Sequence, residues 1–129
     1  MKEDKKLIFL IESDRDILEV YSTALKQQNF DLDIFTRGRE ALSKIQNIGE
    51  KDKKPNLIML DLKLIDMDGI EILKVIKENE LTKNIPIFVF SEYIITELPK
   101  LNLTDRDKFI MYGTINLWPL MDMVKDQLK

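Results

Sequence analysis

The 129-residue chain contains neither cysteine nor histidine. Without cysteine it can form no disulfide, no thiolate zinc site and no cysteine nucleophile. Without histidine it has no imidazole base or imidazole metal ligand, and it cannot be the phosphohistidine donor of a phosphoryl transfer. Any metal that it binds should therefore be a hard cation that prefers oxygen ligands, such as Mg²⁺.

Long apolar runs and an excess of basic charge are also missing. No stretch approaches the roughly 20 apolar residues that span a bilayer, and the run at residues 7–11 is too short for a signal peptide. The net charge of −3 leaves no basic footprint for nucleic acid. We therefore expect one cytoplasmic domain over residues 1–129, with no membrane or nucleic-acid partner.

Strand-like and helix-like segments alternate along the chain. Strands are expected at residues 7–11, 30–35, 56–61, 85–90 and 109–112. Helices are expected after Asp14, from Gly38, from Gly69, as a short element between Tyr93 and Leu101, and over residues 120–128. Such a repeat predicts an α/β fold, with a parallel sheet covered by helices on both faces.

Polar side chains stand at the ends of three of these strands. Glu12 closes the apolar run 7–11, Asp61 follows the run 56–60, and Ser91 comes after Phe90. Ligands of parallel sheets bind outside the carboxyl ends of the strands, so we expect the three residues to converge. A carboxylate at the tip of a buried strand is costly to leave unpaired. The two acids therefore predict a site for a hard cation and phosphate.

Four segments together resemble the receiver domain of two-component response regulators, in its single-domain form. They are Leu10–Asp14, Leu57–Leu64, Met67–Gly69, and Asn84–Ile87 with Ser91. The resemblance implies a flavodoxin-like, doubly wound sandwich. Its five-stranded parallel sheet would have the order 2-1-3-4-5, with five helices on two faces.

The resemblance also implies roles for the site residues. Asp61 would be the phosphoacceptor of a phosphorelay and Ser91 the switch hydroxyl. A Mg²⁺ ion would be held by Glu12, Asp61 and the backbone carbonyl of Lys63. The phosphoryl group would come from a sensor histidine kinase or a histidine phosphotransfer protein, and the signal would pass to a downstream protein. Such a domain is no enzyme beyond promoting its own phosphotransfer and dephosphorylation.

The active site is nevertheless atypical for that family. Receivers usually have a second acid where this chain has Ser13, and a hydroxyl is a poorer Mg²⁺ ligand than a carboxylate. Metal affinity should therefore fall unless Asp14 or water substitutes, and a further metal ligand from Ser13 or Asp14 stays open. Receivers also carry a lysine before a proline after the fifth strand. Matching on Pro119 places Trp118 there.

A second register of this region stays open. If the fifth strand is residues 109–112, the residues that follow it are Gly113 and Thr114. Neither register supplies the lysine. The aromatic residue that receivers carry three positions before the lysine would be Ile115 in the Pro119 register.

Other interpretations of the same residues remain. Asp61 could be a strand-end cap, Glu12 a surface acid, and Ser91 a helix N-cap. The chain could also be a degenerate pseudo-receiver, a protein-interaction module that does not depend on phosphorylation. A homodimer could form through the last strand and helix, by Trp118, Leu120 and Met121. An aspartyl-phosphate phosphatase is disfavoured by Lys63 at the general-acid position, and a flavin module by the lack of a phosphate loop.

Overall fold

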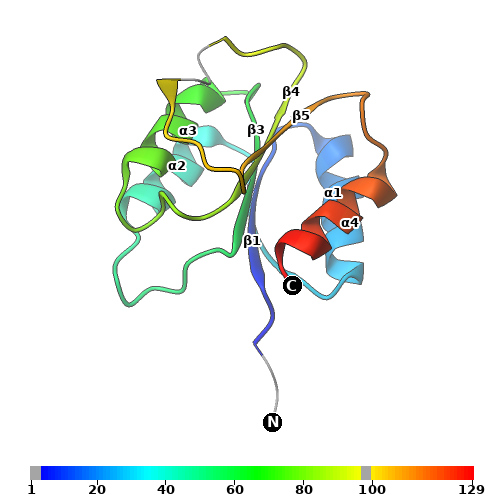
Figure 1. The fold of residues 1–129 in the computed structure, drawn as a ribbon, viewed down its shortest axis with the longest axis horizontal. Helices are drawn as coiled ribbons and strands as arrows, with labels where there is room; N and C mark the ends of the chain where they lie inside the picture. The colour runs from blue at the N-terminus through cyan, green and yellow to red at the C-terminus, as the bar shows by residue number, and fades with distance from the viewer. Residues whose placement is uncertain (1–3, 97–99) are drawn as a thin grey trace.

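The computed structural model describes residues 4–96 and 100–129. Their strands are β1 (Leu7–Ile11), β2 (Asp31–Phe35), β3 (Leu57–Asp61), β4 (Ile87–Ser91) and β5 (Lys108–Met111). Their helices are α1 (Arg15–Gln27), α2 (Gly38–Gln46), α3 (Gly69–Glu78) and α4 (Leu117–Gln127). The strands form one parallel sheet in the order β2-β1-β3-β4-β5. Helices α2 and α3 cover one face and α1 and α4 the other (Figure 1).

The predicted α/β sandwich and its strand order are confirmed, with one difference in the helices. Four helices rather than five are found in the described part of the chain. The short helix expected between Tyr93 and Leu101 falls partly on residues 97–99, which lie outside the described residues. In the described part, Tyr93 and Ile94 are exposed and lie in bends and irregular backbone.

The core has two layers, one on each side of the sheet. Strands β1, β3 and β4 are buried along their whole length, as expected of parallel strands that are covered on both faces. The edge strands β2 and β5 are more exposed. No helix in the ranges that the structure describes is long and apolar enough to cross a membrane.

Aspartates fix the starts of three helices. Asp14 accepts backbone N–H groups at the start of α1 and Asp68 does so at α3, which confirms Asp14 as an N-cap. Asp66, from the loop after β3, accepts the N–H groups of Gly38 and Arg39 at 2.7 and 3.0 Å. These bonds hold the start of α2 beside the carboxyl end of β3 and lower the pKa of Asp66.

Helix α4 begins earlier than predicted, at Leu117, and this changes which of its residues are accessible. Leu120 and Met121 are each 1% exposed, in the core between α4 and the sheet. They cannot form the proposed homodimer contact without unpacking the helix, so that part of the prediction is wrong. Trp118 is 56% exposed.

A buried ion pair anchors the segment that leads into β5. The Nζ atom of Lys77, at the end of α3, lies 2.6 Å from Oδ2 of Asp107, and their side chains are only 2% and 1% exposed. The other oxygen of Asp107 accepts the N–H of Ile87 at 2.9 Å, and Oδ2 also accepts the N–H of Thr104. One carboxylate thus joins α3 to the beginnings of β4 and β5.

Candidate functional site

Glu12 and Asp61 lie side by side at the carboxyl end of the sheet. Strands β1 and β3 are neighbours, with Ile11 opposite Leu60, so the next residue of each strand reaches the same edge. Glu12 is 2% and Asp61 6% exposed, and their carboxyl groups are close enough to shift each other's pKa. The predicted convergence of these two acids is confirmed.

A tyrosine that the sequence interpretation overlooked completes this acid pair. Tyr112 directly follows β5, and its hydroxyl donates to Oε2 of Glu12 at 3.2 Å. Its ring stacks on Phe90 of β4 with centroids 5.9 Å apart, and Phe90 in turn contacts Tyr21 of α1. The aromatic stack holds the Tyr112 hydroxyl over the acids.

The assignment of Trp118 to the family lysine position is wrong. Strand β5 ends at Met111, so the residue that follows the strand is Tyr112, and Trp118 lies in the first turn of α4. Pro119 was matched to the proline that follows the family lysine. Proline is also tolerated in the first turn of a helix, and Pro119 lies in the first turn of α4. Counting three residues back from Tyr112 gives Phe109 rather than Ile115 as the aromatic position.

The alternative prediction, a fifth strand at residues 109–112, was displaced by one residue from the observed strand. The expected strand 109–112 included Tyr112 as its last member, whereas the observed strand is Lys108–Met111. Tyr112 could have been found from the sequence if the strand had been ended at Met111. The next residue, Tyr112, would then have been assigned to the position after the strand.

Burial and mutual proximity change the proton affinity of both acids. The pKa of Glu12 rises from 4.5 to about 8, first because the group is desolvated and then because of the neighbouring Asp61. Desolvation also raises the pKa of Asp61, and the negative charge of Glu92 adds to this. Burial beside the same acids strongly raises the pKa of Tyr112, so its hydroxyl remains a neutral donor. At neutral pH the acid pair therefore retains a proton.

The Ser13 hydroxyl has a structural task. Its hydroxyl donates to the carbonyl of Thr36 at 2.7 Å and accepts the N–H of Ile65 at 3.1 Å. It thereby ties the loop after β1 to the loops after β2 and β3. Asp14 is engaged as the N-cap of α1, and its own N–H donates to Glu12 at 3.0 Å.

The donor set of the site suits a small, hard cation. Glu12 and Asp61 supply two carboxylates, and residues 4–96 and 100–129 hold no cluster of three or more acids that could enclose a metal. Mg²⁺ is commonly bound by one or two carboxylates and keeps several waters, so it does not need a cage of protein ligands. The two buried carboxylates are close together with no positive charge between them, and a bound cation would supply that charge. These residues fit Mg²⁺.

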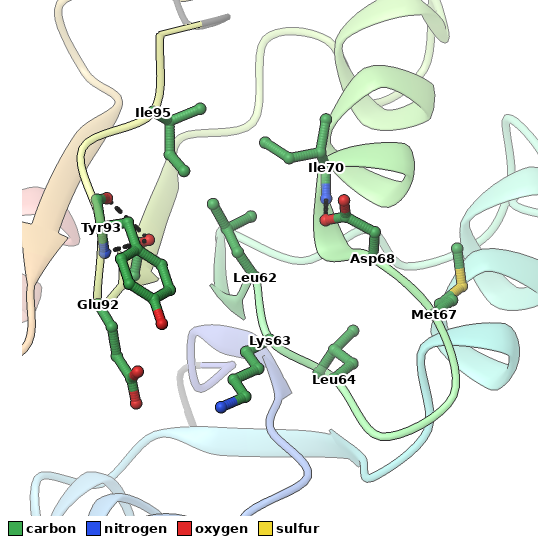
Figure 2. Close-up of a pocket in the computed structure, with 10 residues that line it drawn as sticks. Leu62, Lys63, Leu64, Met67, Asp68, Ile70, Glu92, Tyr93 and Ile95 are labelled. Carbon is green, nitrogen blue, oxygen red and sulfur yellow. Dashed lines mark hydrogen bonds between the residues drawn. The ribbon is translucent and has the colours of Figure 1, made fainter.

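Ser91 ends β4 at the same edge of the sheet, and its hydroxyl is bonded within the turn that follows. It is the last residue of β4, not a residue after the strand. Its Oγ atom donates to the carbonyl of Tyr93 at 2.9 Å and accepts the N–H of the same residue at 3.0 Å (Figure 2). In this conformation the hydroxyl organises the turn after β4. The residues that follow directly form bends, which gives no support to a helix N-cap.

Two open cavities adjoin at this edge of the sheet. One, of about 510 Å³, lies over Asp61 and is lined by Ser13, Asp14, Ile17, Asp61, Lys63, Leu64, Ile65, Glu92 and Tyr112. The other, of about 540 Å³, lies between the loop after β3, α3 and the turn after β4. Lys63 and Glu92 line both, and Figure 2 shows their side chains extending to the same side.

The sequence matches the family described as the response regulator receiver domain over residues 8–101. The response regulator Rcp1 of Synechocystis sp. is 37% identical over 90 residues, which cover 67% of this chain and 61% of Rcp1. The chain thus spans less than two thirds of that relative.

Solved structures of similar proteins share the fold. The Mn²⁺-bound form of Rcp1 has a TM-score of 0.73 at 29% identity, and the alignment covers 94% of this chain and 90% of that one. The phosphorylated cyanobacterial phytochrome response regulator RcpA has a TM-score of 0.75 at 29% identity, with coverages of 95% and 91%. Sequence and fold agree. The chain belongs to the response regulator receiver domain family.

Proposed function

We propose that this chain is a receiver module of a two-component phosphorelay and that Asp61 is its phosphoacceptor. The observation that carries the proposal is the pairing of Asp61 with Glu12 at the carboxyl end of the sheet, under an open cavity of about 510 Å³. Asp61 closes β3, and its Oδ1 atom accepts the N–H of Lys63 at 3.0 Å. That bond holds the carboxylate in place at the base of the cavity.

The reaction follows from the chemistry of the carboxylate. An oxygen of Asp61 would attack the phosphorus of a phosphohistidine on a sensor kinase or phosphotransfer protein. The new O–P bond makes an acyl phosphate, while the P–N bond breaks and its electron pair returns to the imidazole nitrogen. Water later cleaves the acyl phosphate and restores the carboxylate. The chain would thus promote its own phosphorylation and dephosphorylation, and it would not turn over any other substrate.

The metal requirement belongs to this proposal. Glu12, Asp61 and the backbone carbonyl of Lys63 would hold Mg²⁺, which supplies positive charge beside the transferring phosphoryl group. The Ser13 hydroxyl is already occupied by its two backbone partners. Asp14 lines the cavity and keeps its Oδ2 atom for a bound water. The metal site therefore offers two carboxylates, and its affinity should be modest.

Residues 1–129 would act as one receiver domain, and its output would be a contact with a downstream protein. Strand β5 and helix α4 lie after the matched residues 8–101, yet they complete the sheet and its second face. A switch through Ser91 would require its hydroxyl to leave Tyr93 and turn toward Asp61. The cytoplasmic location expected from the sequence remains a prediction.

Mass spectrometry of the intact protein tests the phosphoacceptor. Wild-type protein is incubated with acetyl phosphate and Mg²⁺, and we expect an adduct of one phosphoryl group. The adduct should be absent from Asp61→Asn and present in Asp33→Asn, a control on the exposed edge strand β2. The absence of any adduct at saturating donor would contradict the proposal, and so would an adduct that persists in Asp61→Asn.

A phosphorylation-independent interaction module is the second candidate. Tyr112 in the lysine position favours it, because a neutral hydroxyl replaces a charged group that would bind the phosphoryl oxygens. Two-dimensional amide NMR separates the candidates. A switching receiver should show shifts around Ser91 and β5 when beryllofluoride and Mg²⁺ are added. An interaction module should show none, and its affinity for a partner should be the same in Asp61→Asn.

A further inference from the structure

We propose that the side chain of Lys63 provides the positive charge for the phosphoryl group that the position after β5 does not provide in this protein. The inference rests on the proposed phosphoacceptor role of Asp61. It assigns the Lys63 ammonium group a direct contact with the phosphoryl oxygens, in addition to the role of the Lys63 carbonyl in metal binding.

The charges around the cavity over Asp61 lead to this assignment. Its lining carries three acids, Asp14, Asp61 and Glu92, and a fourth acid, Glu12, lies close to Asp61. Lys63 is the basic residue in that lining, which is drawn from the described part of the chain. The residue after β5, Tyr112, contributes a neutral hydroxyl whose partner is Glu12. A phosphoryl group would therefore meet one side-chain cation here.

The position of Lys63 allows its ammonium group to reach the phosphoryl group. Its backbone N–H bonds to Asp61, and its backbone pairs with that of Asp68 in an antiparallel bridge. The start of the side chain is therefore held beside the carboxylate. The side chain itself is exposed and lines the cavity, and its flexible four-carbon stem can turn the ammonium group toward an anion.

Glu92 lies on the same cavity rim as Lys63. Both side chains extend to the same side of the rim in Figure 2. The charge of Glu92 is felt at Asp61, so these groups share one electrostatic environment. When Asp61 gains a phosphoryl group, the anion beside Lys63 becomes stronger than the single carboxylate of Glu92. The ammonium group would then move inward, and the rim would change with phosphorylation.

Three variants test the assignment. Lys63→Gln removes the charge but keeps the backbone bond to Asp61, and Lys63→Arg keeps the charge. Lys53→Gln is the control, because it makes the same change of net charge at a cavity near the amino end of the sheet. The rate of phosphoryl adduct formation with acetyl phosphate and Mg²⁺ is measured for each. The affinity for beryllofluoride, measured by ¹⁹F NMR, gives a readout that needs no reaction.

We expect Lys63→Gln to lower both the rate of adduct formation and the affinity for beryllofluoride roughly tenfold. This is the lower end of the effect expected when a hydrogen bond to a charged group is lost. Lys63→Arg should retain most of both, and Lys53→Gln should match wild type. Tyr112→Lys places an ammonium group directly after β5. In that background Lys63→Gln should change the rate by less than about twofold, because the charge is already supplied.

The outcomes separate this inference from the function on which it rests. If wild type gains no adduct, the proposed function fails and the inference fails with it. If wild type gains an adduct at the same rate as Lys63→Gln, the inference alone is overturned. An equal loss in Lys53→Gln, or an undiminished loss in the Tyr112→Lys background, would overturn it as well, since either result would show a general charge effect.

Discussion

The two sides of the site follow the family pattern to different degrees. The acid side, Glu12 and Asp61 after β1 and within β3, keeps the carboxylates that a cation and a phosphoryl group need. The switch side, Ser91 and Tyr112 at the ends of β4 and β5, offers a hydroxyl engaged by its own turn and a neutral tyrosine hydroxyl directly after β5. The acid side thus has the carboxylates that the proposed phosphoryl acceptance requires, while the switch side has no positively charged side chain directly after β5.

The difference has an electrostatic consequence. Two buried carboxylates beside a lysine can both be ionised, because the ammonium group compensates them. Here a neutral hydroxyl takes that place, and Glu12 keeps its proton to a higher pH. The raised pKa of Glu12 therefore keeps the acid side partly protonated at neutral pH.

The largest expected effect concerns the buried ion pair at the starts of β4 and β5, the two strands whose carboxyl ends carry the switch side. Lys77→Met would leave the buried carboxylate of Asp107 without its ammonium partner and loosen the starts of β4 and β5. We expect the free energy of unfolding to fall by about 3–5 kcal/mol, as for other buried pairs that lose one member. Urea denaturation followed by circular dichroism measures the loss.

The control for that variant lies on the same helix. Lys74→Met breaks an exposed pair with Glu71 across 3.8 Å, and its cost should be no more than about 1 kcal/mol. Equal losses in the two variants would show that the buried pair does not anchor the starts of β4 and β5.

The next effect tests how tightly the acid side is built. A Cβ atom on Gly69 would lie 2.6 Å from Cα of Leu62 and 2.8 Å from the carbonyl oxygen of Asp61. Backbone atoms cannot turn aside as a flexible side chain can, so Gly69→Ala should cost about 1–3 kcal/mol. It should also slow the formation of the Asp61 adduct.

Thermal denaturation of this variant should be compared with that of Gly49→Ala. The atom nearest to a Cβ on Gly49 is a carboxylate oxygen of Asp52, at 3.4 Å. We expect little change there. If Gly69→Ala were equally harmless, the loop after Asp61 would have more freedom than the structure shows.

A third effect follows from the raised pKa of Glu12. Between its ordinary pKa of 4.5 and its folded value of about 8, the folded protein holds a proton that the unfolded chain has released. Stability without Mg²⁺ should therefore fall as pH rises through this window, by at most about 1.4 kcal/mol per pH unit for one proton. Chemical denaturation at several pH values measures the slope.

Glu12→Gln removes the titrating group and should flatten this dependence. The conservative change keeps one oxygen acceptor, for the N–H of Asp14, and places an amide NH₂ group beside the Tyr112 hydroxyl, which can accept from it. An equal slope in the variant, or a stability that increases with pH, would show that the acid pair does not retain its proton.

The acid side could be predicted from the sequence because local patterns determine it. Strands β1 and β3 are continuous apolar runs, buried along their length. A parallel sheet then brings the residues at their carboxyl ends together without further information. The positions of Glu12 and Asp61 follow from these two facts.

The switch side could not be predicted as well, for two physical reasons. Strand β5 is only partly buried, and its weak pattern left the strand boundary uncertain by one residue, which hid Tyr112. The pairing of Lys77 with Asp107 joins residues that are far apart in sequence. No local periodicity marks such a pair, since a lysine near a helix end and an aspartate in a loop are usually solvated.

The smallest expected effect concerns the bond between the two sides. Tyr112→Phe removes the hydroxyl that donates to Glu12 but keeps the ring on Phe90. We expect a loss of about 0.5–1.5 kcal/mol in the free energy of unfolding. The hydrogen bond lowers the pKa of Glu12, so the midpoint of the pH dependence should also move upward. Denaturation curves across pH measure both changes.

Tyr93→Phe supplies the comparison, because it removes a hydroxyl from an exposed ring in the turn after β4. It should change neither stability nor the midpoint of the pH dependence. If Tyr112→Phe behaved in the same way, Tyr112 would contribute only its ring to the packing on Phe90. The protonation of the acid side would then depend on burial and Asp61 alone, and the two sides of the site would be independent.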